Sequence, residues 1–312
     1  MKAEPIDRRR LPAGAALSHW RAPDGWQVRR MDWPRPEGGA VRGSLLFAGG
    51  RADFIEKYLE ACHHWHARGW NVTSFDWRSQ GGSRGDIAGG HLDSLDPLVG
   101  DLAELMAAWR RQYPGPRAAV AHSMGGHLLL RTLIEKAPPL DAAVLVAPML
   151  GINSGPLPDW LAPWVARGMA LAGRARARVW KASPAPPPSG SLRQRALTSC
   201  PDRYSDELWW WEREPGFSLG PPSWGWMNAA YRSCRRLSAR SLAQVRTPVL
   251  LIGTARDRLV SPAAIRRAAE RILGAELLMF DDAGHEILRE ADTVRLAALG
   301  RVDEFLDRHA VQ

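Results

Sequence analysis

Short apolar runs alternate with helix-length amphipathic stretches along the first half of the chain. The runs at residues 43–50, 70–77, 117–122 and 142–150 predict buried strands. Strands this apolar are typical of sheets that are covered on both faces, as parallel sheets are. The pattern therefore predicts β-α-β units and a mostly parallel central sheet with helices on both faces.

The alternation stops at residue 151 and resumes at residue 247. The segment between, residues 151–246, is rich in Trp, Pro, Arg and Gly and contains 8 of the 15 tryptophans. We expect a sheet domain in two parts, residues 1–150 and 247–312, with residues 151–246 inserted as a mainly helical cap. We also expect residues 1–25 to form a loose arm before an edge strand around "WQVRRMDW".

Positive charge is concentrated in the inserted segment. The chain has a formal net charge of +9, and residues 151–246 carry +8 of it, with 14 Lys and Arg against 6 Asp and Glu. The chain shows no sequence signature of a nucleic-acid-binding module, so we expect no nucleic-acid partner. The start lacks the apolar core of a signal peptide, and no later run has the length of a membrane span. We therefore expect a cytoplasmic protein.

The cysteines and histidines do not predict a metal site. Three cysteines at unrelated spacings fit neither a disulfide framework nor a zinc site and indicate reduced thiols. His63, His64 and His66 are clustered, but no cysteine or carboxylate stands at ligand spacing from them.

A serine stands where a strand passes directly into a helix. In "AVAHSMGGHLLL", Ser123 lies between two apolar runs, with Ala121 and Gly125 two positions away on either side. A sharp strand-to-helix turn needs such small neighbours because strand and helix approach closely there. The pattern is that of a nucleophile elbow with Ala121 in place of the usual first glycine, although an ordinary helix N-cap is the alternative.

Two later strand ends supply partners for a nucleophilic serine, which needs a base and a carboxylate that orients the base. Asp257 follows the strand in "LLIGTARDRLV", and His285 follows the strand in "LLMFDDAGHE". The chain order Ser, Asp, His at the carboxyl ends of one sheet predicts a triad of Ser123, Asp257 and His285. Asp281 and Asp282 compete for the acid's place but lie too close to His285 in sequence.

Acyl transfer also needs fixed donors for the oxyanion. The backbone N–H of Met124, directly after the serine, is the first expected donor. The second should come from "FAGGRADF", where Gly49 and Gly50 let the backbone turn close to the substrate, and the N–H of Arg51 is the best candidate. An ordinary glycine turn is the alternative.

The segments "LLFAGGRADFIEKY", "FDWRSQGGSRG", "AHSMGGH", "GTARDRLV" and "DDAGHE" together resemble the monoacylglycerol lipase and lysophospholipase branch of the α/β-hydrolase superfamily. The resemblance covers nearly everything outside residues 151–246. The chain departs from it at Gly49 and Gly50, where these lipases usually have His-Gly, and at Ser79, where glycine is usual. The resemblance implies an α/β-hydrolase fold, a cap that binds the apolar part of the substrate, and no cofactor.

The resulting hypothesis is a serine carboxylic-ester hydrolase that forms an acyl-enzyme on single-chain acyl lipids, monoacylglycerols or lysophospholipids. One alternative uses the same triad on another bond, as in an aminopeptidase, a thioesterase or a C–C hydrolase. The basic cap argues against an aminopeptidase, which needs acidic groups for the substrate amine. The other alternative is a catalytically silent fold that only binds, and loss of a triad member would be its mark.

The first part of the cap combines an apolar helical stripe with a basic end. The stripe comprises Leu157, Trp160, Leu161, Trp164, Val165 and Met169, and Arg174, Arg176, Arg178 and Lys181 follow it. Two partners fit this pattern. The stripe is buried on the protein body beneath it, or it makes peripheral contact with an anionic membrane surface.

Overall fold

One sheet organises the molecule, which we describe from a computed structural model covering residues 6–85, 90–181 and 187–310. Within these residues eight strands lie in the order β1-β2-β4-β3-β5-β6-β7-β8. The β1–β2 and β2–β4 pairs are antiparallel, and the other neighbours are parallel. The strands are β1 (Ala16–Arg21), β2 (Gln27–Trp33), β3 (Gly43–Ala48), β4 (Trp70–Phe75), β5 (Arg117–His122), β6 (Ala142–Val146), β7 (Val249–Thr254) and β8 (Glu276–Phe280).

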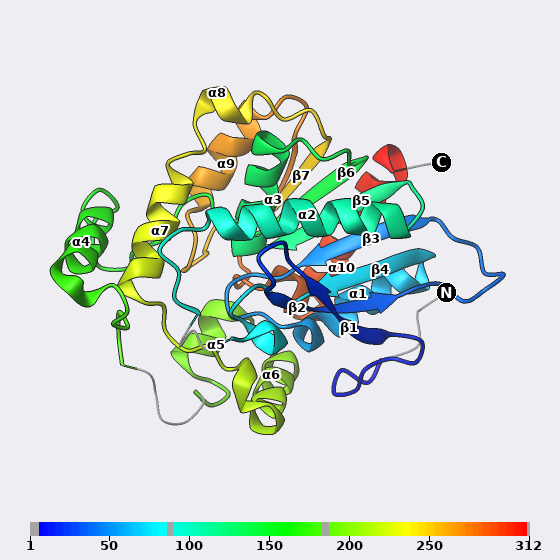
Figure 1. Cartoon of the computed structure of the whole chain (residues 1–312), viewed down its shortest axis with the longest axis horizontal. Coiled ribbons are helices and arrows are strands. Elements are labelled where there is room, and N and C mark those ends of the chain that lie inside the picture. Colours follow the sequence, from blue (N-terminus) through cyan, green and yellow to red (C-terminus); the bar gives the residue numbers. More distant parts are fainter. Residues whose placement is uncertain (1–5, 86–89, 182–186, 311–312) are drawn as a thin grey trace.

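Helices cover both faces of the sheet (Figure 1). Every residue of β3 is buried, and alternate side chains enter two different cores. Leu46 belongs to the core under α2, α3 and α9, whereas Leu45 and Phe47 belong to the core under α1 and α10. The helices are α1 (Leu59–Ala67), α2 (Asp96–Gln112), α3 (Met124–Glu135), α9 (Pro262–Arg271) and α10 (Asp292–His309). The mostly parallel, doubly covered sheet expected from the apolar runs is therefore present.

Five α-helices lie between β6 and β7 in the described residues, where the sequence predicts an inserted segment. They are α4 (Ala162–Met169), α5 (Leu192–Leu197), α6 (Pro201–Arg213), α7 (Trp224–Cys234) and α8 (Ala239–Leu242). Figure 1 shows α4 projecting from the rest of the molecule, far from α5 and α6. We propose residues 151–246 as the cap domain. No helix of the described residues is long and apolar enough to cross a membrane.

From residue 6 onward the N-terminal segment differs from the expected loose arm, and residues 1–5 lie outside the described residues. Strand β1 pairs along its whole length with β2 and forms the edge of the sheet. Further upstream, the Nε of Arg9 lies 2.7 Å from a carboxylate oxygen of Asp206 on α6, and Trp210 of the same helix donates to the carbonyl of Arg8. The strand escaped prediction because an edge strand that exposes nearly all its side chains has no apolar alternation.

Candidate active site

Ser123 occupies the sharp turn between β5 and α3. Its φ of 52° and ψ of −116° belong to a sparsely populated region, which a non-glycine residue adopts only where its surroundings enforce it. Its N–H donates to the carbonyl of Val146 at 2.9 Å, and its carbonyl accepts from Met149 at 3.0 Å. Position 125 requires glycine, because a Cβ there would lie 2.3 Å from the carbonyl oxygen of Gly49. The elbow-like turn predicted from the sequence is therefore present.

The structure brings the three predicted side chains into one hydrogen-bonded chain. His285 Nε2 lies 2.9 Å from Ser123 Oγ, and His285 Nδ1 lies 2.8 Å from Asp257 Oδ2. The other carboxylate oxygen of Asp257 accepts from the N–H groups of Leu259 and Val260, at 2.8 and 2.9 Å. Both of its oxygens therefore have partners that hold the carboxylate in place.

The competing residues lie elsewhere. Asp281 and Asp282 are exposed, and Asp282 pairs with Arg256 at 3.0 Å. His127 is buried on α3 and its Nε2 lies 2.6 Å from the hydroxyl oxygen of Ser233. Nowhere in the described part of the chain do three or more His, Cys, Asp or Glu side chains gather in a way that could hold a metal ion.

The pKa values of His285 and Asp257 are shifted by burial and by each other. Burial alone would lower the pKa of His285, but the charge of Asp257 and its hydrogen bond raise it above the usual value. Burial would raise the pKa of Asp257, but His285 and the backbone N–H groups hold it below its usual value. An ionised Asp257 keeps the ring proton on Nδ1, which leaves Nε2 to accept the serine proton.

The turn after β3 packs directly on the serine. A Cβ at Gly50 would lie 2.9 Å from Ser123 Cβ, so only glycine fits. The Gly50 N–H donates to Asp53 Oδ2 at 2.6 Å, and Arg51 is the next residue of the turn. Met124 begins α3, where a helix leaves its first N–H groups without intrahelical partners and favours negative charge. The roles of Met124 and Arg51 as oxyanion donors stay predictions.

Residues that the sequence did not single out fix this turn. Ala52 has a left-handed φ of 66°, and its N–H donates to Gln80 Oε1 at 2.7 Å. Asp76 accepts from the N–H of Ile55 at 2.8 Å. Gln80 and Asp76 both belong to "DWRSQGGS", and Ser79 within it has a φ of 67°, which explains why glycine is usual there. The segment therefore supports the turn after β3, residues 49–53, which we call the oxyanion turn after its predicted role.

His122 adds a layer behind the triad. The centre of its ring lies 4.9 Å from that of the His285 ring. Its Nδ1 is 2.8 Å from Asp53 Oδ2 and 2.9 Å from the Tyr58 hydroxyl. His122 thus connects the oxyanion turn to the histidine of the triad.

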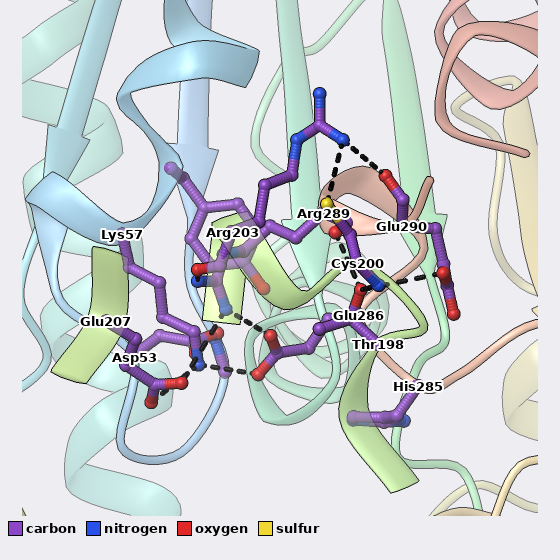
Figure 2. Close-up of polar contacts among 12 residues, drawn as sticks. Asp53, Lys57, Thr198, Cys200, Arg203, Glu207, His285, Glu286, Arg289 and Glu290 are labelled. Carbon is purple, nitrogen blue, oxygen red and sulfur yellow. Dashed lines mark hydrogen bonds and ion pairs between the residues drawn. The ribbon is translucent and has the colours of Figure 1, made fainter. Parts of the chain in front are cut away.

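The cap contacts the loop of His285 through its backbone. The N–H of His285 donates to the carbonyl of Ala196 on α5 at 3.1 Å, and the N–H of Glu286 donates to Leu197 at 2.7 Å. A Cβ at Gly284 would lie 2.4 Å from the Leu197 carbonyl oxygen, so this approach requires glycine. Figure 2 shows the cap segment after α5 and the Glu286–Glu290 segment side by side. These backbone hydrogen bonds from the cap therefore help to position His285.

The other end of the cap exposes its aromatic side chains. Trp160 is 71% exposed and Trp164 is 59% exposed. Helix α4 instead packs on Tyr231 of α7 through Ala162 and Ala166. The alternative in which the body buries the whole apolar stripe is therefore wrong for both tryptophans, because the small alanines form the contact face.

Known proteins resemble the chain over nearly its whole length. The sequence profile of the family described as "Serine aminopeptidase, S33" matches residues 39–292. Lysophospholipase L2 of Escherichia coli K12 is 28% identical over 286 residues, which cover 85% of this chain and 80% of that protein. The probable lysophospholipase L2 of Haemophilus influenzae is 26% identical over 275 residues, covering 86% of this chain and 85% of that protein.

A solved structure also resembles the chain. The soluble variant of monoglyceride lipase from Saccharomyces cerevisiae, in complex with a substrate analog, superimposes with a TM-score of 0.77 at 16% identity. The match covers 98% of this chain and 99% of that one. Likeness at this identity shows the fold, and the expected α/β-hydrolase fold is confirmed.

Proposed function

Because this chain belongs to the serine aminopeptidase S33 family and is a carboxylic-ester hydrolase, we propose that it hydrolyses single-chain acyl lipids with Ser123, His285 and Asp257. The single observation that carries the proposal is the hydrogen-bonded chain from Ser123 Oγ through the ring of His285 to Asp257. Such a chain lets a buried imidazole activate a serine hydroxyl that is itself only partly buried.

In the proposed reaction His285 removes the proton of Ser123 while Oγ attacks the ester carbonyl. The N–H groups of Met124 and Arg51 stabilise the tetrahedral oxyanion. Collapse of this intermediate breaks the ester bond, and His285 protonates the departing alcohol. A water molecule, deprotonated by His285, then attacks the acyl-enzyme, releasing the fatty acid and restoring Ser123. No cofactor is needed.

The surroundings of the triad favour an ester over a peptide with a free amine. An aminopeptidase binds the substrate's ammonium group with carboxylates, but both Asp53 and Glu286 are already held by Lys57. The lysophospholipase names of the two relatives point the same way. We therefore place ester hydrolysis before the aminopeptidase, thioesterase and C–C hydrolase alternatives.

Three arginines favour an anionic headgroup, and so a lysophospholipid over a monoacylglycerol. Arg84 donates to the carbonyl of Ser218 and Arg51 to that of Gly220, each at 3.0 Å. A Cβ on Gly220 would lie 3.7 Å from the guanidinium carbon of Arg178. Burial and the charge of Arg178 lower the pKa of Arg51 to about 9, so a phosphate beside these groups would be stabilised.

An ester panel tests the proposal. We expect hydrolysis of lysophospholipids and monoacylglycerols that Ser123→Ala abolishes, and loss of fluorophosphonate labelling in the same variant. Arg84→Gln and Arg178→Gln should lower kcat/KM for lysophospholipid severalfold relative to monoacylglycerol, whereas Arg240→Gln, an exposed arginine on α8, should leave the ratio unchanged. Activity confined to esters of two to four carbons would refute the lipid substrate, and an unchanged ratio would refute the headgroup preference.

A further inference from the structure

A buried ammonium group lies beneath the oxyanion turn. The side chain of Lys57 is 3% exposed, and its Nζ lies 2.7 Å from Asp53 Oδ1, 2.6 Å from Glu286 Oε1 and 3.3 Å from Glu207 Oε1. Figure 2 shows the ammonium between these three carboxylates. None of these four residues is among the site residues predicted from the sequence.

The three carboxylates come from three separate parts of the chain. Asp53 closes the oxyanion turn, because its other oxygen accepts the N–H of Gly50. Glu286 directly follows His285 in the chain. Glu207 lies on cap helix α6. One ammonium group therefore connects the oxyanion turn, the loop of the triad histidine and the cap.

The cluster is electrically balanced. Arg289 pairs with Glu286, and Arg193 pairs with Glu207 at 2.8 Å. Three cations thus face three carboxylates, with His122 and Tyr58 as the further titratable groups next to Asp53. Removing one member of such a buried set leaves the remaining charges uncompensated, which costs far more than losing an exposed ion pair.

The charges persist across the pH range in which the enzyme would work. Burial alone would lower the pKa of Lys57, but Asp53, Glu207 and Glu286 raise it above its usual value. Burial would raise the pKa of Asp53, but Lys57 and His122 hold it well below its usual value. Burial is likewise outweighed for Glu207, whose pKa falls to about 2 mainly because of Arg193.

We propose that Lys57 is a positioning residue for ester hydrolysis. By holding Asp53 and Glu286 together, it fixes the oxyanion turn against Ser123 and fixes the loop of His285, with cap helix α6 as a third attachment. The inference rests on the proposed function only in requiring an ester reaction at Ser123. It assigns Lys57 no contact with the substrate.

The test replaces Lys57 by Met, which keeps the length of the side chain and removes the charge. On a short-chain nitrophenyl ester, we expect kcat to fall at least tenfold while KM stays within threefold of wild type. The pH profile of kcat should gain an ionisation that wild type lacks, because loss of the ammonium group removes the charge that favours the ionised carboxylates around it.

Arg30→Met is the matched control. Arg30 is 6% exposed, and its guanidinium group lies 2.6 Å from Asp32 on the same strand, β2, and 2.7 Å from Gln112 on α2, neither of which belongs to the candidate site. It should lower stability while leaving kcat and the pH profile unchanged. A folded Lys57→Met variant that behaves like Arg30→Met would overturn the proposal.

If Lys57→Met does not fold, Asp53→Asn is the second test of the proposed role of Lys57. Asp53→Asn has the same shape and weakens the link from Lys57 to the Gly50 N–H, so we expect a similar loss of kcat. A kcat within threefold of wild type in folded Asp53→Asn would overturn the proposal. A wrong lipid substrate gives a different result, since wild type would cleave the short ester but no acyl lipid.

Discussion

The two ends of the cap meet the rest of the molecule in opposite ways. Helices α5 and α6 are joined to the body by buried charge and by backbone bonds, with Glu207 fully buried and the Ala196 carbonyl accepting from the N–H of His285. Helix α4 buries only Ala162 and Ala166, and Trp164 on the helix and Trp160 just before it are exposed. One end of the cap therefore belongs to the active site, and the other presents a surface.

The two kinds of contact serve different purposes. Buried ion pairs and backbone hydrogen bonds depend on direction and distance, so they fix one arrangement of the segments that they join. Exposed tryptophans beside arginines do not require one fixed arrangement of segments. They are well suited to the boundary between water and the acyl chains of a membrane. Arg167 lies over the ring of Trp164, at 5.9 Å from its centre, as part of this surface. We propose that α4 makes the peripheral contact with an anionic membrane.

The largest expected effect is the loss of catalysis in Ser123→Ala, with membrane binding unchanged. Ser123→Ala removes the nucleophile, and kcat should fall by about a millionfold, as for other serine hydrolases that lose this residue. Because none of the hydrogen bonds of Ser123 given above involves α4, co-sedimentation with anionic vesicles should equal that of wild type. Hydrolysis above 1% of the wild-type rate in a sample free of contaminating esterase would contradict the assigned nucleophile.

The next effect concerns the attachment of the cap to the histidine loop. Glu290 is 1% exposed, and its side chain accepts the N–H of Gly284 and, at 2.9 Å, that of Ser199. In Glu290→Gln an amide NH₂ faces one of these donors, which should lower the free energy of unfolding by about 1–3 kcal/mol.

The rate constant should respond as well. Gly284 precedes His285, so kcat of Glu290→Gln should fall severalfold, measured together with urea denaturation. The control is Glu304→Gln on α10, a carboxylate that is 67% exposed and should change neither quantity. A stable, fully active Glu290→Gln would show that the loop of His285 does not depend on this attachment.

At the exposed end of the cap, loss of apolar side chains should change vesicle binding and leave hydrolysis unaffected. Trp160→Ser combined with Trp164→Ser should weaken binding to anionic vesicles at least tenfold, since about 1.4 kcal/mol of lost apolar transfer free energy already gives this factor. Hydrolysis of a soluble nitrophenyl ester should stay at the wild-type rate. Leu273→Ser with Leu296→Ser removes two exposed apolar side chains outside the cap and serves as the control. Equal vesicle binding by both double variants would refute α4 as the membrane surface.

The sequence predicts the residues of the triad but not the contacts of α4. Ser123 and Asp257 follow buried strands and His285 follows the partly exposed edge strand β8, so their chain order and the geometry of a parallel sheet were enough to predict that they meet. The alanine-lined contact face of α4 was not predictable, because an apolar stripe does not say whether protein or lipid covers it.

The positioning residues were hidden for a different reason. Lys57 and Glu286 are 229 positions apart, and the lysine of "FIEKY" resembles any solvated residue of an amphipathic stretch. Neither composition nor periodicity shows that a cap helix will seal it from water. Gln80 and Asp76 were noticed only as part of a family resemblance, because their role depends on the turn that they hold.

The smallest expected effect is on the pH dependence of hydrolysis, and it sharpens the comparison most. His285 acts as a base only when neutral, so kcat/KM falls as the pH drops through its pKa. Asp257 raises that pKa, so half-maximal activity on a soluble ester should lie above about pH 6.5, the usual value for histidine. Asp257→Asn should lower this midpoint, because it removes the charge that raises the pKa of His285.

The same pH midpoint, measured in the variant that lacks both tryptophans, tests whether the two ends of the cap act independently. Trp160 and Trp164 have no part in the cluster around His285, so removing both should leave the midpoint where wild type has it. A soluble ester is essential here, because an anionic vesicle lowers the pH at its own surface. If the midpoint moved with these substitutions, the exposed end would be coupled to the catalytic charges, and the division of the cap into a fixed half and a surface half would fail.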